Sequence, residues 1–359
     1  MLSLAAFLLV LGVLIFVHEF GHFIVAKRLG VRVENFSLGF GRKIYKRKIG
    51  DTEYSVSAVP LGGYVKLAGD NIEEYKGEPF EYYSQPIKKR AMIIFCGPLL
   101  NYILGFLFFW LIFFVGYPAL TTKVGGVLDG FGAQKAGIIK DDRIMAVDGQ
   151  KVKYWEELQK AIQDKKAETS VVLSVERQGK ELSLSVQIKE KKFSDALGKK
   201  RSMGMLGIAP GDETIKVRYG FFKAFSLGVA NTLDLTSLTY EALWRMITGR
   251  LSMKDSVSGP LGIFDITARA ARLGIIPLMH LMAVLSISLA LFNLLPLPVL
   301  DGGHLLFLAI EKIRGRMLSL KAERIVTQAG LTLIIAIGIA VTYNDIVRLY
   351  GEKIAGLFK

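Results

Sequence analysis

The sequence predicts a polytopic α-helical membrane protein with about four transmembrane helices, a membrane-associated β-hairpin region and one inserted α/β domain. Three observations predict this fold class. Hydrophobic residues make up 51% of the 359 residues, and the mean hydropathy of +0.38 is typical of a membrane protein with a sizeable polar portion. Apolar runs of about 20 residues occur four times. A long polar segment, large enough to form a domain, separates the second run from the third.

We expect the four spans at residues 1–26, 91–116, 275–310 and 325–347. Charge indicates their orientation, because short loops rich in Lys and Arg stay in the cytoplasm. Residues 27–90 carry 13 Lys and Arg against 8 Asp and Glu, and the short loop after the third span is also basic. Both segments are therefore predicted to be cytoplasmic, and the N-terminus and the segment between spans two and three to lie outside.

Residues 213–274 are predicted to form an amphipathic helix and a linker. The hydrophobic stretch at 221–248 contains Asp234, Glu241 and Arg245. These charges favour a helix on the membrane surface. A fifth crossing would also break the orientation that the charged loops indicate.

His18 and His22 enclose Glu19 in a His-Glu-x-x-His motif within the first span. Two histidines four residues apart share one helix face and can bind one Zn²⁺, while the glutamate between them can act as general base. The chain has only four histidines, which makes a chance match rare. A charge inside an apolar helix costs about 2.5–3.5 kcal/mol on insertion scales, so Glu19 is a functional candidate by default. The motif indicates a zinc hydrolase that cuts peptide bonds within the bilayer.

A catalytic zinc site usually has three protein ligands. The best candidate for the third is Asp301, whose carboxylate would be costly in an apolar segment without a metal. His304 is the rival, and we rank it as a supporting residue. Pro296 and Pro298 prevent a regular helix here, and such irregular backbone is tolerated beside a wet cavity. Spans one and three both run towards the cytoplasm, which places Asp301 at a depth similar to that of the histidines.

Three motifs together resemble the site-2 protease family of intramembrane zinc metalloproteases: residues 18–22, 97–101 and 293–304. The resemblance covers essentially the whole chain. It implies that His18, His22 and Asp301 bind Zn²⁺ and that Glu19 is the catalytic base. It also implies that Asn293 contacts the substrate backbone, with the break at Pro296 and Pro298 as a place for an unwound substrate.

Residues 27–90 are predicted to form a membrane-associated β region on the cytoplasmic side, and residues 31–68 within it are similar to the membrane-associated hairpin of this family. Its glycines allow close backbone approach and tight turns. An exposed strand edge could accept an unwound substrate as an added strand, and a plain structural hairpin is the alternative. The candidate substrate-binding residues are Gly39, Gly41, Gly62, Gly63 and Tyr64.

Residues 120–212 are predicted to be an extracytoplasmic α/β domain. Residues 136–149 look like the core signature of a bacterial PDZ domain, and Leu206, Gly207 and Ile208 resemble its peptide-binding loop. The domain would then bind peptides or filter substrates by size, and a rigid spacer without a ligand is the alternative. The best-known sigma-E proteases of this family carry two such domains, whereas this chain has room for one.

Charge, cysteine content and motif count argue against several other classes of protein. The net charge of +14 is spread along the chain without an aromatic-basic module, so we expect no nucleic-acid partner. Cys96 is the only cysteine, which rules out an intrachain disulfide. A receptor with a structural metal would normally show four ligands, and a transporter would normally show internal repeats. We expect a bacterial cytoplasmic (inner) membrane protein whose partners are transmembrane protein substrates, a peptide or substrate ectodomain, and lipid.

Overall fold

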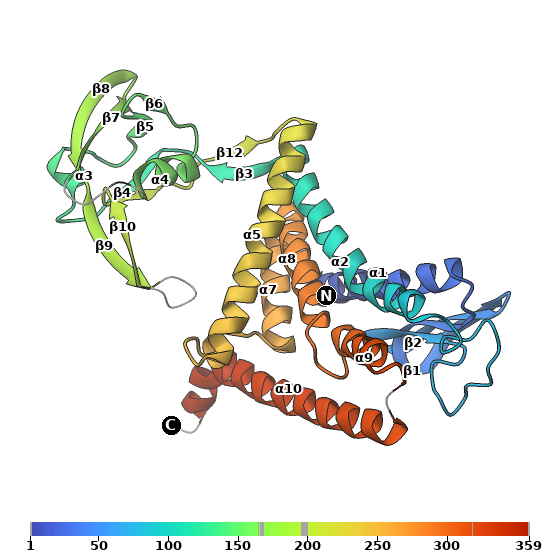
Figure 1. Cartoon of the computed structure of the whole chain (residues 1–359). Coiled ribbons are helices and arrows are strands. Elements are labelled where there is room, and N and C mark those ends of the chain that lie inside the picture. Colours follow the sequence, from blue (N-terminus) through green and yellow to red (C-terminus); the bar gives the residue numbers. More distant parts are fainter. Residues whose placement is uncertain (1, 164, 166–168, 195–199, 318, 358–359) are drawn as a thin grey trace. The chain divides into compact units, whose positions relative to one another are not determined.

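The computed structural model describes residues 2–163, 165, 169–194, 200–317 and 319–357 (Figure 1). The chain divides into two compact units. The helical unit contains Met1–Ile112, Phe225–Leu243 and Ser252–Lys359, and the β-rich unit contains Phe113–Ala224 and Trp244–Leu251.

Four helices of the described chain are long and apolar enough to cross a membrane. They are α1 (Leu2–Arg28), α2 (Ile87–Val115), α8 (Ile275–Asn293) and α10 (Leu320–Leu357). An 18-residue stretch in each of these helices has a mean hydropathy of 2.1 to 2.3, and apolar side chains on all sides suit helices that face lipid or one another. The predicted polytopic helical fold class is confirmed.

The third predicted span is two helices in the structure. Helix α8 ends at Asn293, and α9 (Asp301–Arg314) begins only after the loop 294–300. Pro296 and Pro298 lie in this loop, where they cannot supply the backbone N–H groups that would continue a helix. Asp301 is thereby brought to the first turn of a new helix.

Three further helices lie between the β-rich segment and α8. They are α5 (Phe221–Ile247), α6 (Met253–Ser256) and α7 (Pro260–Leu273). Helix α5 has 27 residues but is not among the four helices apolar enough to span a membrane. This agrees with the charged residues that the sequence places along it.

Helix α7 is held at its first turn by a residue of α10. The Asp345 side chain is fully buried, and its Oδ2 accepts a hydrogen bond of 2.7 Å from the backbone N–H of Gly262. The N-cap position, Gly259, provides no side-chain hydrogen bond. Asp345 therefore supplies a cap from another helix, where a carboxylate also favours the helix dipole.

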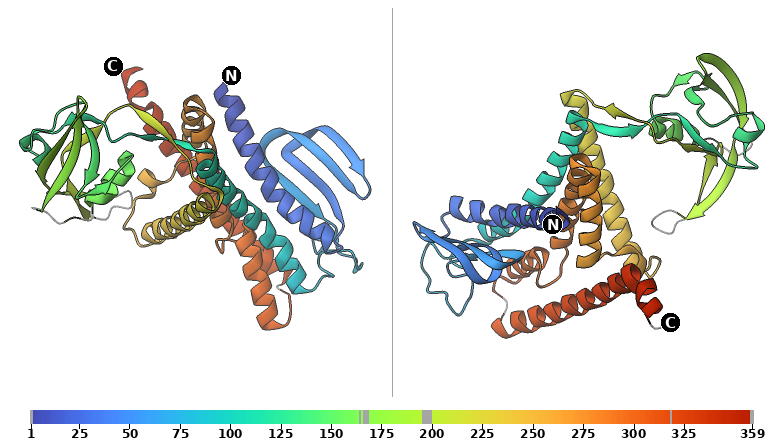
Figure 2. Two further views of the ribbon diagram at one scale, coloured as in Figure 1. Left: turned by 90° about the horizontal axis from the view of Figure 1, so that it is seen from above. Right: turned by 180° about the vertical axis from the view of Figure 1, so that it is seen from behind.

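Strands β1 (Val33–Ile49) and β2 (Thr52–Leu67) form a sheet beside α1 (Figure 2). The two long strands bend, so the register contains four segments. Segment 33–38 pairs with both 63–67 and 53–56, and segment 52–57 also pairs with 43–49. The order across the sheet is 43–49, 52–57, 33–38 and 63–67, which makes 43–49 and 63–67 its two edges.

The sheet packs on α1 through aromatic side chains. Phe36 lies 5.9 Å from Phe16 and 5.1 Å from Phe23 between ring centroids, and Tyr54 lies 5.9 Å from Phe23. Phe23 and Phe36 are buried, and burying each of these two rings is worth about 1.5–3 kcal/mol. The contacts fix the sheet against the half of α1 that carries the histidines.

The β-rich unit has a four-stranded sheet in the order β6-β5-β7-β8 and three two-stranded pairs, β4 with β11, β3 with β12, and β9 with β10. Its core is apolar and centred on Val124, Ile144, Leu158, Leu173 and Val186. The strands are β3 (Tyr117–Leu120), β4 (Val124–Val127), β5 (Arg143–Val147), β6 (Gln150–Lys151), β7 (Ser170–Arg177), β8 (Lys180–Gln187), β9 (Lys189–Ser194), β10 (Lys200–Met205), β11 (Ile208–Pro210) and β12 (Thr214–Val217), and the helices are α3 (Gly132–Lys135) and α4 (Trp155–Gln163).

The buried carboxylate of Asp142 forms an ion pair with Arg177 in this unit. Arg177 donates to both carboxylate oxygens of Asp142, each at 2.8 Å, and the N–H of Ile139 donates to Oδ2 at 2.9 Å. Burial opposes the charge on Asp142, but these hydrogen bonds outweigh it and hold the pKa of Asp142 below its ordinary value.

Candidate metal and peptidase site

The two histidines of the motif lie on one face of α1. The Nε2 atoms of His18 and His22 are 3.3 Å apart, and the rings meet edge to face. This follows from the helical repeat, because residues four apart lie one above the other.

Two glycines let α1 and α2 cross closely at this point. A methyl group on Gly21 would overlap the Cys96 carbonyl, and one on Gly97 would overlap the His22 ring. Small residues at a membrane helix crossing let backbones approach in this way. The His22 imidazole is thus packed directly on the α2 backbone.

The far nitrogen of each imidazole has a partner on α2. His22 Nδ1 lies 2.9 Å from the carbonyl oxygen of Ile93, one turn before Pro98, which lies inside the helix. His18 Nδ1 lies 3.5 Å from the side-chain amide of Asn101. A carbonyl acceptor on Nδ1 leaves the lone pair of Nε2 free for a metal.

The amide of Asn101 is buried, and its Oδ1 has no hydrogen-bond partner among the described residues. Turning the amide by 180° places Oδ1 against Nδ1 of His18. This orientation supplies the acceptor that an Nδ1–H of His18 needs.

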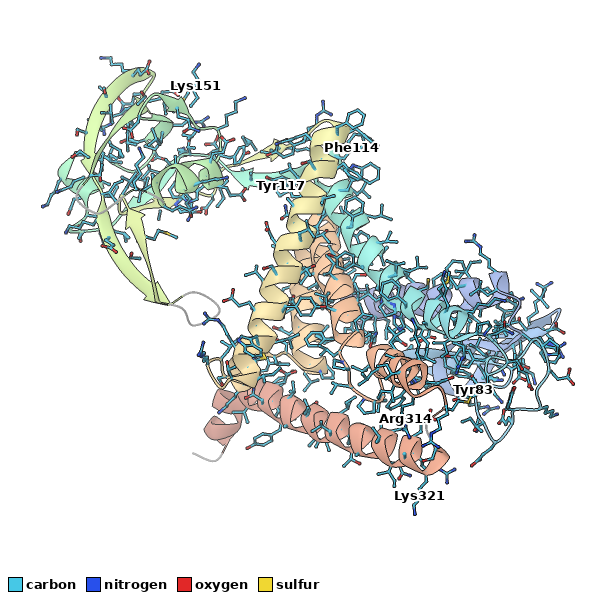
Figure 3. The ribbon with its side chains drawn as sticks, in the orientation of Figure 1. Tyr83, Phe114, Tyr117, Lys151, Arg314 and Lys321 are labelled. Atoms are coloured by element: carbon cyan, nitrogen blue, oxygen red, sulfur yellow. The ribbon has the colours of Figure 1, made fainter. Side chains whose placement is uncertain are left out.

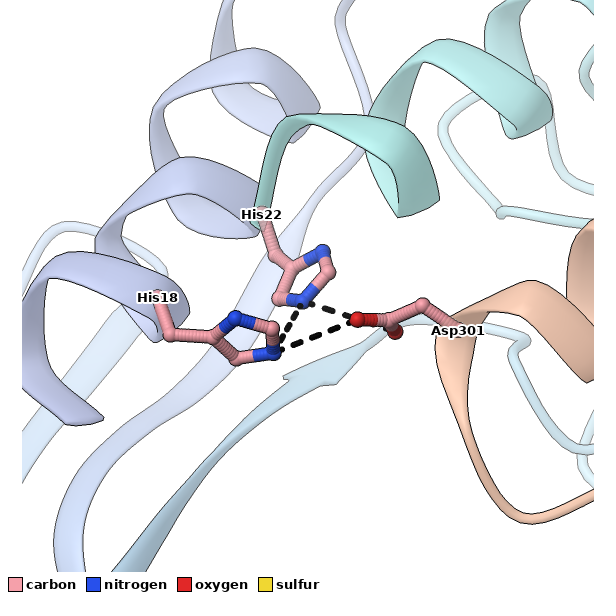
Figure 4. Close-up of side chains that lie close together, drawn as sticks. All are labelled: His18, His22 and Asp301. Carbon is pink, nitrogen blue, oxygen red and sulfur yellow. Dashed lines mark hydrogen bonds and ion pairs between the residues drawn. The ribbon is translucent and has the colours of Figure 1, made fainter. Parts of the chain in front are cut away.

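Asp301 of α9 points at both histidines (Figure 4). Its Oδ2 lies 3.2 Å from Nε2 of His18, and its Oδ1 lies 3.7 Å from Nε2 of His22. Side chains on the next two residues would not fit, because a Cβ on Gly302 or Gly303 would overlap carbonyls of the 294–300 loop. The loop therefore folds tightly over the start of α9 and fixes the carboxylate.

The donor set fits a zinc ion. Ligands about 2.0–2.2 Å from one ion at tetrahedral angles lie about 3.3–3.6 Å from one another. The two Nε2 atoms are 3.3 Å apart, each has a different carboxylate oxygen of Asp301 at 3.2 or 3.7 Å, and one donor atom from each residue lies within 4.8 Å of the others. Asp301 Oδ2 is buried without a hydrogen-bond partner among the described residues. A buried carboxylate oxygen facing imidazole lone pairs is unfavourable until a cation lies between them.

A cavity of about 470 Å³ opens beside these atoms. Glu19 lines it together with Asn293, whose amide nitrogen lies 3.5 Å from Nε2 of His18. The edge segment 63–67 forms another wall, and a Cβ on Gly63 would lie 3.1 Å from Cγ of Glu19. At another part of the wall, the buried Arg90 of α2 pairs with Glu311 of α9.

Comparison with known proteins decides the family. A model of peptidase family M50 matches residues 6–337. The chain belongs to peptidase family M50. Among the relatives of this M50 peptidase, the regulator of sigma-E protease RseP of Escherichia coli (strain K12) is 33% identical over 453 aligned residues, which cover 97% of this chain and 99% of that protein. The resemblance to site-2 proteases drawn from the motifs is thereby confirmed.

A second relative of this M50 peptidase is closer in length. It is a protein of Agrobacterium fabrum that bears the provisional name of a zinc metalloprotease, and it is 36% identical over 364 residues, 96% of each chain. The alignment with RseP extends over 453 residues, whereas this chain has 359 residues. RseP therefore contains a segment without a counterpart in this chain. Of the solved structures, the PDZ domain of the SdrC-like protein from Listeria monocytogenes matches 27% of this chain and 90% of that one, with 22% identity and a TM-score of 0.21.

Other predicted site residues lie further from the imidazoles. Pro296 is exposed in the 294–300 loop, and Pro298 packs against Gly330 of α10. Gly39 and Gly41 adopt positive φ angles of 89° and 84° where the first sheet segment turns into the next. Gly62 lies under the ring of Phe40. This ring stacks on the ring of Tyr64, with 6.4 Å between the ring centroids.

The predicted peptide loop of this M50 peptidase lies in the β-rich unit. Leu206 is buried in its core, and the carbonyls of Leu206 and Gly207 accept hydrogen bonds from Ala133 and Leu128. Ile208 begins β11 and pairs with Val127.

Sequence reasoning did not assign a role to Asn101 or Ile93. Asn101 is the last residue of the motif quoted from the second span, which was a signal for it. Ile93 contributes only a backbone carbonyl, so no side-chain pattern could have indicated it.

Proposed function

We propose that this M50 peptidase is a zinc metalloendopeptidase that cleaves transmembrane segments of single-span membrane proteins inside the bilayer. One observation carries the proposal. His18 and His22, on a helix apolar enough to span a membrane, converge with Asp301 of α9 beside Glu19. Three ligands leave a fourth position open, as in catalytic sites. A receptor braced by a structural metal would need a fourth ligand, and the described His, Cys, Asp and Glu residues supply three.

Metal binding, proton transfer and substrate binding are assigned to different residues of the site. His18, His22 and Asp301 would hold Zn²⁺, which supplies a Lewis acid that activates water and polarises the scissile carbonyl. Glu19 takes a proton from the attacking water and passes it to the leaving amine. The amide of Asn293, beside His18, holds the substrate backbone near the site.

The sheet edge next to Glu19 orients the substrate. A helical peptide bond is shielded by its own hydrogen bonds, so the substrate must open before water can attack. Segment 63–67 has a neighbour on one side only among the described strands, and an unwound substrate can add to its free side as a further strand. Gly63 and Tyr64 belong to this edge and Gly62 directly precedes it, while Gly39 and Gly41 shape the turn behind it. The loop with Pro296 and Pro298 leaves room for extended chain.

Charge supports a topology for these parts. In the bacterial cytoplasmic membrane, residues 27–90 and the loop between α9 and α10 face the cytoplasm by the positive-inside rule. Arg314 and Lys321, labelled in Figure 3, belong to the two helix ends that this loop joins. The active site then lies towards the cytoplasmic side, and residues 120–212 lie outside.

The α/β domain at residues 120–212 is proposed to act as a PDZ domain that binds a peptide or the ectodomain of a substrate near Leu206, Gly207 and Ile208. Residues 213–274 link it to the helices that complete the site. Anti-sigma factors and remnant signal peptides are the substrate classes that such a protease would cut.

Replacement of Glu19 by Gln tests the function. The Glu19→Gln variant should keep zinc at one ion per chain, because Glu19 is not a ligand, and should accumulate uncut membrane substrates. Comparison of membrane fragments from cells with wild-type and variant protein reveals both the activity and the substrates. Cleavage by the variant at the wild-type rate would refute Glu19 as the base, and a chain that binds no zinc in either form would refute the metallopeptidase.

A further inference from the structure

The edge of the sheet away from Glu19 is strongly basic. Residues 42–48 contain five Lys or Arg, and every residue from 41 to 50 is exposed. In the register, segment 43–49 pairs only with 52–57, so it forms the edge opposite to 63–67. We call residues 42–49 the basic edge.

We propose that the basic edge binds the anionic phospholipid headgroups of the cytoplasmic leaflet. The proposal rests on the topology given under the proposed function, and it adds a lipid-specific contact to the sheet that presents the substrate. Four to eight basic residues beside a membrane span are typical of binding to anionic lipid.

The charges of the basic edge are largely uncompensated. Only Lys43 has an acidic partner among the described residues, the carboxylate of Glu53. Arg42, Lys46, Arg47 and Lys48 have no ion pair within the part of the chain that the structure describes. A hydrogen bond from Lys43, with the positive charges of Lys46 and Lys48, holds the pKa of Glu53 below its ordinary value, so Glu53 stays charged and the excess of positive charge persists.

Exposed apolar side chains are interspersed among these charges. Ile44 is 73% exposed, Tyr45 57% and Ile49 55%. Aromatic and aliphatic groups among Lys and Arg suit the boundary between headgroups and hydrocarbon, where the apolar parts insert and the charges remain among phosphates. A nucleic-acid surface would not favour exposed isoleucines.

One end of the basic edge lies near the predicted cytoplasmic end of α1. Ile49 pairs with Thr52, whose hydroxyl donates to the carbonyl of Val33 at 2.8 Å. Val33 follows the end of α1 at Arg28 by five residues, at the predicted cytoplasmic boundary. Lys43 starts deeper in the sheet, but its ammonium reaches the Asn35 side chain at 3.3 Å, towards the same boundary. Long basic side chains reach the interface from deeper positions in this way.

This contact would matter for the site because both edges belong to one sheet. Headgroups on the basic edge hold the sheet at a fixed depth along α1, and segment 63–67 beside Glu19 is held with it. Anionic lipid would thereby help to position the strand to which the substrate adds.

Energy transfer to labelled lipids tests the proposal in the full-length protein. A donor dye is placed on an Asp51→Cys side chain in the exposed turn after the basic edge, in a Cys96→Ala background. The vesicles are phosphatidylcholine with one-fifth phosphatidylglycerol. The acceptor dye is carried by either lipid in turn, and the ratio of the two transfer signals reports local enrichment.

Acceptor-labelled phosphatidylglycerol should be enriched about fivefold over acceptor-labelled phosphatidylcholine. This ratio corresponds to the attraction of about 1 kcal/mol between one basic side chain and an anionic membrane surface. The enrichment should fall as sodium chloride is raised. It should disappear when Arg42, Lys46, Arg47 and Lys48 are all changed to Gln, with Lys43 kept because it pairs inside the sheet.

The matched control changes four exposed lysines of the β-rich unit to Gln: Lys151, Lys153, Lys160 and Lys180 (Lys151 is labelled in Figure 3). This control should keep the enrichment. Equal signals from the two lipids, or a loss as large in the control, would overturn the proposal. So would displacement by millimolar inorganic phosphate at constant ionic strength, because the edge would then bind free phosphate. Zinc content and cleavage are separate readouts, so failure here leaves the proposed peptidase standing.

Discussion

The ring of His22 rests on the backbone of Gly97, so closely that a methyl group on Gly97 would overlap it. Because the neighbouring backbone belongs to α2, the position of one proposed zinc ligand depends on a helix that supplies no ligand itself.

Replacement of Gly97 by Ala should therefore disturb the metal without changing any ligand. The added methyl group displaces the imidazole, and we expect zinc affinity to fall by about 10- to 100-fold, as when groups that orient a ligand are lost. Competition with a chelator measures this. Gly12→Ala in α1 is the control, since a Cβ there meets nothing within 4 Å. Wild-type zinc affinity in Gly97→Ala would contradict the geometry.

Asn101 is predicted to orient His18 through its carbonyl oxygen. Changing Asn101 to Leu removes the acceptor, so zinc affinity should fall by about tenfold or more. Asn101→Asp retains an acceptor oxygen and should bind zinc more tightly than the Leu variant. The two affinities, measured side by side, test the role, and equal values would show that Asn101 only fills space.

The identity of the third ligand can be tested by two substitutions on α9. Asp301→Ala should lose zinc and cleavage together, because two protein ligands remain. His304→Ala should retain zinc, since His304 lies outside the group of converging donor atoms. Metal content per purified chain measures both. The reverse pattern would make His304 the ligand.

Asp345 is predicted to hold the start of α7. Asp345→Ala removes the cap, which typically costs about 1 kcal/mol, and amide exchange at Gly262 should become roughly fivefold faster. Hydrogen exchange of the full-length protein gives the rate. Thr342→Ala is a suitable control, because the Thr342 hydroxyl donates to the carbonyl of Gly338 within α10. Unchanged exchange at Gly262 would show that the cap does not stabilise α7.

The buried pair of Asp142 and Arg177 should make the β-rich unit sensitive to acid. Because the pKa of Asp142 is lower in the folded state, its contribution is complete above the unfolded pKa of about 3.9 and is lost as pH falls through the folded pKa. Asp142→Asn should destabilise the unit by about 3 kcal/mol near neutrality. That difference should shrink below about pH 4. Hydrogen exchange in β5 and β7, corrected for intrinsic rates, measures it, and a difference independent of pH would exclude the ion pair as its source.

The sequence predicted those parts of the site that depend on local pattern or on the cost of burial. His18 and His22 share a face because they lie four apart on one helix, and Asp301 stood out because an isolated carboxylate is expensive in an apolar segment. Asn101 and the Ile93 carbonyl could not be assigned from the sequence alone, since their roles arise only where α1 and α2 cross.

The fold shows the same division. The four spans follow from apolar length, and the break after α8 follows from Pro296 and Pro298. The order of the four sheet segments does not, because segment 33–38 pairs with two partners far along the chain. Non-local pairing of this kind depends on how the sheet packs against α1, which no local pattern encodes.

The proposed ligands come from opposite ends of the chain, two from α1 and one from α9. During synthesis, α1 enters the membrane long before α9 has been translated. A nascent chain therefore carries two histidines without their carboxylate, and it cannot hydrolyse its own helices or those of its neighbours while it is being inserted. Catalytic competence would be acquired only after α9 has been translated.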